Sequence, residues 1–74
     1  MPHVTISHFP KDLDEAGRER LVTRLTEAVR DAFEVEEDVV SIALRPVAPE
    51  AWDEEVYRPE IAARPELLVK QPAY

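Results

Sequence analysis

The sequence predicts an α/β fold built on one βαβ unit, followed by short helical turns in the C-terminal third. Residues 2–9 alternate apolar and polar side chains, residues 13–33 repeat apolar side chains with a helical period, and residues 39–45 are nearly all apolar. A helix between two strands of one sheet makes the strands parallel and the crossover right-handed. The chain, residues 1–74, is short enough to form a single domain.

The first strand is expected over residues 2–9. Val4 and Ile6 alternate with Thr5 and Ser7, which is the period of a half-buried strand. Pro10 has no N–H to donate to a neighbouring strand, so the strand should end there.

The helix is expected over residues 13–33, with a charged outer face. Asp12 and Glu15 have the spacing of an N-terminal capping pair. The apolar stripe that would face the sheet recurs at steps of three and four residues and consists of Leu21, Val22, Leu25, Ala28, Val29, Ala32 and Phe33. The acidic residues 34–38 that follow are interpreted as a solvated loop rather than a binding patch.

The second strand, residues 39–45, has the composition of a strand buried on both faces. Five of the seven prolines follow it, which favours short helical turns around residues 49–56, 59–63 and 65–70. One face of the sheet would be covered by the helix. The other face requires the C-terminal third or a second copy of the chain.

Self-association is expected from length alone. A chain of 74 residues buries about 60% of its unfolded surface and is marginal as a monomer. It has no cysteine for a disulfide, and its two histidines are too few for a structural zinc site. A partner subunit is the remaining way to stabilise the fold, so we expect a homodimer in which the partner completes the sheet.

The charge excludes several functions. Nine Lys and Arg oppose 16 Asp and Glu, for a net charge of −7. Such a surface repels nucleic acid and anionic membranes. No apolar run is long enough for a membrane span and no secretory signal is evident, and the lack of cysteine favours a cytoplasmic protein.

Most familiar catalytic motifs are missing. No Ser-His-Asp elbow, glycine-rich phosphate loop or HExxH motif is present. His3 and His8 are five residues apart on one strand, so they should lie on opposite faces as separate surface or edge residues rather than as a ligand pair.

Pro2 is the remaining candidate. A small second residue permits removal of the initiator methionine, which would leave Pro2 as a secondary amine fixed at the end of a strand. A free α-amino group has a pKa near 7.7–8.0, and an apolar pocket or a nearby cation would lower the pKa of this amine toward neutrality. Such a group suits proton abstraction beside a carbonyl. Many proteins begin with Met-Pro without using the proline.

The order of these features resembles the tautomerase superfamily, specifically the 4-oxalocrotonate tautomerase family in its dimeric, short-chain bacterial branch. The similarity covers nearly the whole chain. The segments that carry it are Pro2-His3-Val4, Phe9-Pro10-Lys11, Leu13-Asp14-Glu15, Ser41-Ile42-Ala43-Leu44, Pro49-Glu50-Ala51-Trp52 and Lys70-Gln71-Pro72-Ala73-Tyr74.

The resemblance implies a single tautomerase-like domain and a cofactor-free, metal-free isomerase. Pro2 would be the general base that moves a proton between an enol and the neighbouring carbon of a small 2-oxo acid. Trp52 would form an aromatic wall that keeps the proline dry. The expected partners are a small-molecule substrate and a second copy of the chain.

Two departures affect substrate binding. The hexameric branch of the family holds substrate carboxylates with two arginines, where this chain has the segment Pro10-Lys11-Asp12 and Ser41. Lys11 or Arg45 could replace one of them. Lys11 could equally be a solvated lysine at a strand end, and Arg45 a salt-bridge partner of the acidic loops. Tyr57 could line the pocket, although packing under the C-terminal segment is favoured.

Two rival functions stay open. A hydratase or dehalogenase could use the same proline, but it would need a carboxylate to activate water, for which Glu50 is an unremarkable candidate. Alternatively, the chain could be a non-catalytic acidic dimerisation module that retains Met1.

Overall fold

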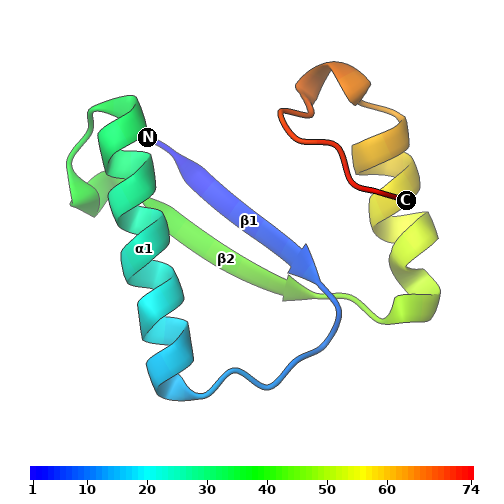
Figure 1. Cartoon of the computed structure of the whole chain (residues 1–74), viewed down its shortest axis with the longest axis horizontal. Coiled ribbons are helices and arrows are strands. Elements are labelled where there is room, and N and C mark those ends of the chain that lie inside the picture. Colours follow the sequence, from blue (N-terminus) through cyan, green and yellow to red (C-terminus); the bar gives the residue numbers. More distant parts are fainter.

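The computed structural model describes all residues, 1–74, as a βαβ unit followed by a helical C-terminal segment (Figure 1). Strand β1 (His3–His8) leads through helix α1 (Glu15–Phe33) to strand β2 (Ser41–Pro46). The two strands are parallel neighbours, in a register that runs from His3 opposite Ser41 to His8 opposite Pro46. The predicted βαβ unit is therefore confirmed.

The two faces of this sheet differ in character. Val4 lies opposite Ile42 and Ile6 opposite Leu44, and Ile6 and Leu44 line one cavity together with Leu21 of α1. This apolar face therefore lies toward the helix. No residue of β2 is buried, so one chain does not provide the two-sided burial expected of this strand, because nothing in the chain covers its other face.

Helix α1 begins with a different cap from the one expected. Asp14, not Asp12, is the N-cap residue, and its carboxylate accepts a hydrogen bond from the Gly17 backbone N–H at 2.7 Å. A Cβ at position 17 would lie 2.8 Å from that oxygen, so glycine permits the close approach. The helix ends at Glu34, which has a left-handed backbone (φ 54°).

Arg30 joins the end of α1 to the acidic segment that follows. Its guanidinium lies 2.9 Å from the Asp31 carboxylate and 2.6 Å from that of Glu37, at the start of the 3-10 turn η1 (Glu37–Val39). The hydrogen bond and charge of Asp31, followed by those of Glu37, raise the pKa of Arg30 above its ordinary value. The remaining residues of the segment are solvated, apart from half-buried Val35.

The C-terminal third is helical but follows different boundaries from those predicted. It consists of 3-10 turns η2 (Pro49–Ala51) and η4 (Pro65–Leu67) on either side of a π-helix, η3 (Asp53–Ala62). Pro49 and Pro65 each begin a turn, where the missing N–H is not needed. Pro59 does not separate two turns as expected, because the wide turn of the π-helix continues through it.

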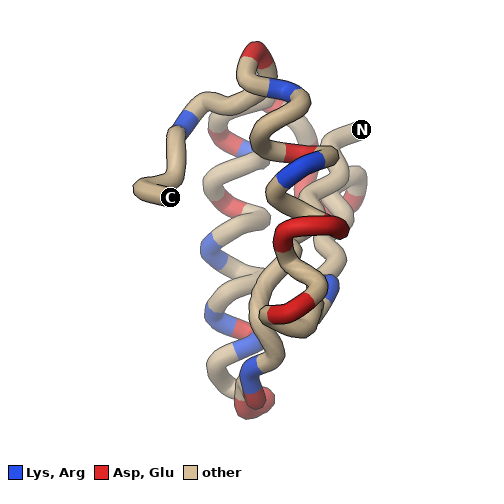
Figure 2. The backbone as a smooth tube through the Cα atoms, turned by 90° about the vertical axis from the view of Figure 1, so that its right-hand side faces the viewer, with Lys and Arg blue, Asp and Glu red and all other residues tan.

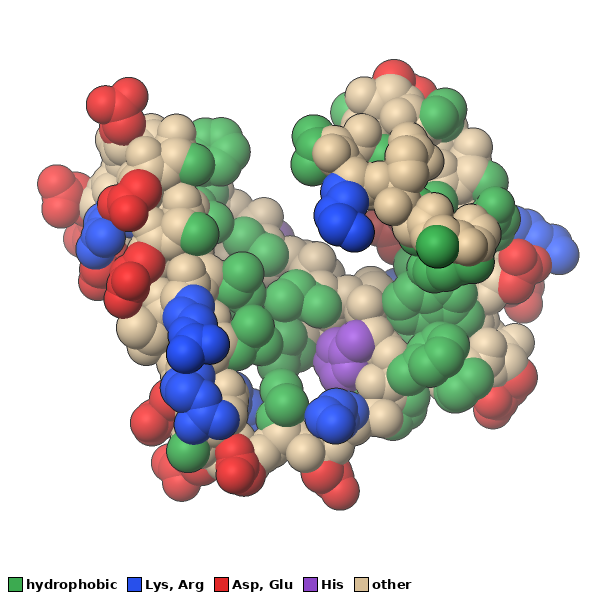
Figure 3. Space-filling model, viewed as in Figure 1, with side chains coloured by type: hydrophobic (Ala, Val, Ile, Leu, Met, Phe, Trp, Pro, Cys, Tyr) green, Lys and Arg blue, Asp and Glu red, His purple; other side chains and the backbone are tan.

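The single chain is open rather than compact. Only Val47 and Val56 are buried, at 4% and 5% exposure; Val47 directly follows β2 and Val56 lies within η3. The C-terminal segment stands beyond the end of β2 and apart from α1 (Figure 1). It leaves His3, Thr5 and Ser41 of the polar face exposed. The hollow between the segment and α1 is lined largely by hydrophobic side chains (Figure 3). None of the helices has both the length and the apolar character required to cross a membrane.

Candidate functional site

Pro2 lies half-buried immediately before β1. Its carbonyl accepts a hydrogen bond from the Ser41 backbone N–H at 3.2 Å, which fixes the start of the strand. Met1, 97% exposed, precedes it, so the proline nitrogen is an amide while Met1 is attached and becomes a basic secondary amine when Met1 is removed.

The side chains next to Pro2 are polar. The His3 ring nitrogen Nδ1 lies 2.6 Å from Ser41 Oγ, and Nε2 lies 3.2 Å from Thr5 Oγ1. Both ring nitrogens are therefore engaged by hydroxyl groups. Neither aromatic pair of the chain, Phe9 with Trp52 or Tyr57 with Tyr74, includes a residue next to Pro2.

An aromatic cluster lies at the opposite end of β1. The Phe9 and Trp52 rings meet edge to face, with centroids 5.1 Å apart and planes at 85°. The Trp52 indole N–H donates to the Tyr74 hydroxyl at 3.3 Å. Phe9, Trp52 and Tyr74 border an open apolar hollow of about 440 Å³, a volume within the range of small-molecule sites.

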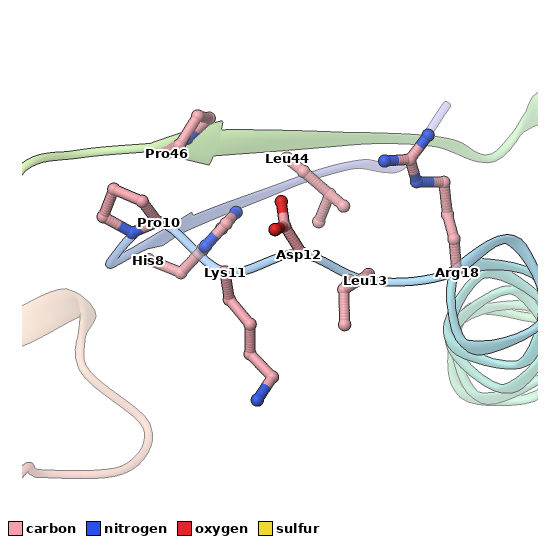
Figure 4. A pocket seen from close by; sticks show the side chains of 8 residues that line it. All are labelled: His8, Pro10, Lys11, Asp12, Leu13, Arg18, Leu44 and Pro46. Carbon is pink, nitrogen blue, oxygen red and sulfur yellow. The ribbon is translucent and has the colours of Figure 1, made fainter.

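Lys11 borders a more polar cavity on the same side of the molecule. This cavity, of about 580 Å³, extends over the segment between β1 and α1 and is also lined by Asp12 and Arg18. In Figure 4 the Lys11 side chain extends away from Asp12 and Arg18. Neither Lys11 nor Arg18 forms an ion pair, which leaves both cations free for an anionic ligand. Sequence reasoning missed Arg18 because it belongs to the charged outer face of the helix.

Arg45 is engaged within the chain. Its guanidinium lies 2.8 Å from the Glu55 carboxylate and 3.9 Å from that of Glu60. Both acidic residues belong to η3. In Figure 2 several Asp and Glu positions, coloured red, mark the helical segment nearest the viewer. The sequence left open whether Arg45 binds substrate or pairs with the acidic loops. In the structure Arg45 forms salt bridges, but its partners lie in a helix rather than in a loop.

The remaining candidates are dispersed. Tyr57 packs against Tyr74, with ring centroids 5.8 Å apart, and also borders a cavity beside Trp52. Glu50 is exposed in η2 and has no ion-pair partner.

The two histidines do not share a binding partner. Nδ1 of His8 lies 2.7 Å from the Phe9 carbonyl oxygen, which His3 does not contact. No group of three His, Cys, Asp or Glu side chains is arranged to hold a metal ion.

The proposed base and the other predicted site residues lie at opposite ends of one sheet. At about 3.3 Å per residue, β1 separates Pro2 from His8 by about 20 Å, and Trp52 contacts Phe9, which follows His8. Lys11 and Arg45 also belong to the far end. One chain therefore does not bring Pro2 together with Trp52, Lys11 or Arg45.

A βαβ chain with two parallel strands and a proline directly before the first of them belongs to the class of small α/β proteins with an open sheet. Comparison with known proteins identifies the family. The family model described as "Tautomerase enzyme" matches residues 2–56, so the chain belongs to the tautomerase family. The match begins at Pro2 and includes Trp52.

Bacterial relatives named Tautomerase PptA match the whole chain. The protein from Cronobacter sakazakii is 38% identical over 74 residues, which cover all of this chain and 97% of the relative. The relatives from Escherichia coli O139:H28 and Pectobacterium carotovorum are 35% and 32% identical over the same shares. The similarity thus extends over the C-terminal segment as well as the βαβ unit.

Proposed function

We propose that the protein is a cofactor-free keto–enol tautomerase of small enolic 2-oxo acids, with Pro2 as its general base. The uncharged Pro2 amine takes the proton of the substrate's 2-hydroxyl group. The 2-oxo group forms as the double bond shifts, and the same proton is delivered to C3. Atoms and charge balance without a metal or a redox cofactor.

The observation that carries this proposal is the position of Pro2. It is the first residue of the family match, and it is held at the strand start by the hydrogen bond between its carbonyl and Ser41. A cyclic amine at such a place has little freedom to reorient, which favours proton transfer along one direction. The neighbouring imidazole of His3 has both ring nitrogens engaged by the hydroxyl groups of Ser41 and Thr5.

Association with a second copy is supported by the openness of the chain. Its accessible surface is 6004 Å², against about 4,700 Å² for a compact monomer of 8.5 kDa. Its radius of gyration is 14.0 Å, against about 11.3 Å for a compact chain of 74 residues. The excess surface includes the apolar hollow between α1 and the C-terminal segment.

The free edge of β1 is the edge suited to pairing. The backbone N–H groups of Ser41 and Val47 donate to carbonyls at the two ends of β1. Successive N–H groups of a strand point to opposite sides, so those of Ile42 and Leu44 point away from β1, toward the free edge of β2. At the next outward position Pro46 has no N–H, a feature of strands that remain at a sheet edge. For the same reason, His3, Thr5 and Ser7 point their backbone N–H and C=O groups toward the free edge of β1. None of these three residues is a proline, so this edge lacks no N–H donor.

A homodimer paired through β1 would also complete the site. Two copies related by a two-fold axis perpendicular to the sheet have antiparallel β1 strands and helices on one face. Thr5, the middle outward residue, would lie at the axis. Pro2 of one chain would then lie beside the partner subunit's Phe9, and hence beside the partner subunit's Trp52. The proposed site is shared between two chains in this arrangement.

Lys11 is the proposed partner of the substrate carboxylate. It has no ion-pair partner and lies next to the aromatic cluster. Arg45 is held by Glu55 and Glu60, so its use in binding would require breaking those pairs. In the shared site Lys11 and Trp52 belong to one subunit and Pro2 to the other.

The test is to block the nitrogen of Pro2. Inserting an alanine between Met1 and Pro2 turns the amine into an amide and leaves the pocket in place. We expect ketonisation of enolic phenylpyruvate to fall by at least the 10²–10⁴-fold typical of general acid–base catalysis. The unmodified protein, whose intact mass must show loss of Met1, should give a kcat/KM that rises with pH as the Pro2 amine loses its proton.

Pro2→Ala is the matched control, because it retains a free but primary and more mobile amine. We expect this variant to keep more activity than the extended protein. An extended protein that folds, associates and remains fully active would show that Pro2 is not the base.

A further inference from the structure

Tyr74 joins three parts of the chain that are distant in sequence. Its hydroxyl accepts the indole N–H of Trp52 at 3.3 Å, and its ring lies 5.8 Å from the ring of Tyr57. It also lines the apolar cavity that Phe9 and Trp52 form. Tyr74 remains 67% exposed, so these contacts are not explained by burial in a core.

Trp52 has few other constraints on its orientation. Phe9 meets it edge to face on one side, and its indole N–H has the Tyr74 hydroxyl as its hydrogen-bond partner. A half-buried tryptophan normally satisfies its N–H in this way. Without Tyr74 the indole could rotate toward water and reduce the apolar wall.

We propose that Tyr74 is a positioning and specificity residue, which holds Trp52 in place and borders the apolar subsite that accepts the aromatic tail of a substrate. This inference rests on the proposed function. It adds the residue that favours an aryl-substituted acid such as enolic phenylpyruvate, because the three rings border an open hollow with almost no polar lining. A short aliphatic acid would leave that cavity unfilled and would gain little from Tyr74.

Fluorescence measures the positioning directly, because Trp52 is the single tryptophan of the chain. Tyr74→Phe removes the hydroxyl and keeps the ring, and we expect it to shift the Trp52 emission. Tyr57→Phe is the matched control, since the Tyr57 hydroxyl forms no hydrogen bond with Trp52 and its loss should leave the emission unchanged.

Ligand binding measures the specificity without requiring turnover. The probes are 3-phenylpropanoate and butanoate, titrated against the Trp52 fluorescence of the complete protein. Loss of one aromatic contact is expected to weaken binding of 3-phenylpropanoate to Tyr74→Ala by about 3–10-fold. Binding of butanoate should change less than twofold.

Equal emission from the two phenylalanine variants together with unchanged binding of 3-phenylpropanoate by Tyr74→Ala would overturn the proposal. Equal weakening of both probes would overturn the specificity role, because it indicates a general structural effect. The same titration on the protein with Pro2 blocked separates this inference from the proposed function. Binding that still depends on Tyr74 supports the aryl subsite, whatever the outcome of the activity test.

Discussion

The two ends of β1 differ in what they contribute to a site. The amino end has Pro2 with a polar surrounding of His3, Ser41 and Thr5. The carboxyl end has the aromatic cluster, the free cation Lys11 and the imidazole of His8, but it lacks Pro2. Each end alone holds only part of the proposed site. The proposal therefore requires the amino end of one chain to lie beside the carboxyl end of another.

The strongest test of this difference is complementation between two inactive chains. We expect Trp52→Ala to lower kcat/KM for an aryl substrate by about 10–200-fold, because an apolar wall of the pocket is lost. Co-expression with the chain extended before Pro2 should restore about a quarter of the wild-type activity per total protein, since half of the dimers are mixed and each has one intact shared site.

The kinetic readout distinguishes the shared site from a site within one chain. If Pro2 and Trp52 acted within one chain, every site in the mixture would carry a defect and co-expression would restore nothing. Separately purified chains, assayed before and after mixing under conditions that allow exchange, provide the control.

The second test concerns the edge that joins the two chains. The protein has no cysteine, so Thr5→Cys introduces a single thiol at the proposed two-fold axis. Antiparallel neighbours that exchange backbone hydrogen bonds at such an axis have Cα atoms about 5.5 Å apart, within the range of a disulfide. We expect oxidation to convert most of the protein into a covalent dimer on a non-reducing gel.

Thr23→Cys is the matched control for this experiment, because Thr23 is exposed on α1. It should remain monomeric on the gel. Light scattering of the unmodified protein should give the mass of two chains. A dimeric mass without cross-linking of Thr5→Cys would place the interface elsewhere.

The third test compares the two cations at the carboxyl end. Lys11→Met should raise KM for a 2-oxo acid by about tenfold, since it removes a charged partner of the carboxylate. Arg45→Met should change KM less than twofold and lower stability by at most about 1 kcal/mol, because its partners Glu55 and Glu60 are partly exposed. The reverse order of KM effects would assign the carboxylate to Arg45.

The smallest expected effect concerns the scaffold rather than either end. Asp14→Ala removes the N-cap of α1 and should lower the free energy of unfolding by about 1 kcal/mol. Asp12→Ala is the control and should have almost no effect on stability. Urea denaturation measures both, and an equal loss from the two variants would contradict the assignment of the cap.

Local sequence patterns were enough to predict the βαβ unit. The alternation of Val4 and Ile6 and the apolar stripe of the helix depend on neighbouring residues, so their period alone indicates the element. The cap was placed two residues early because Asp12 and Asp14 both precede the helix, and only the backbone geometry selects Asp14. The π-helix was missed because its wide turn accommodates Pro59, which in an α-helix would break the hydrogen-bonding pattern.

The candidate site likewise has residues that the sequence could suggest and contacts that only the structure shows. The chain's own chemistry predicts Pro2 as the base, since few groups offer a base near neutral pH, and the resemblance to the tautomerases adds Trp52; both roles stay predictions. Tyr74 could not be connected with Trp52 from the sequence, because 22 residues separate them and no periodicity relates them. The pairing of Arg45 with η3 likewise depends on where the C-terminal segment turns.

The sequence by itself determined the elements of the βαβ unit and their parallel order, and it singled out the residue proposed as the base, because these depend on local periodicity and on the chemistry of single residues. Tertiary structure decided which residues meet. It placed Phe9, Trp52 and Tyr74 together and put the length of β1 between them and Pro2, since distances across a fold arise from the packing of segments that are far apart in the chain.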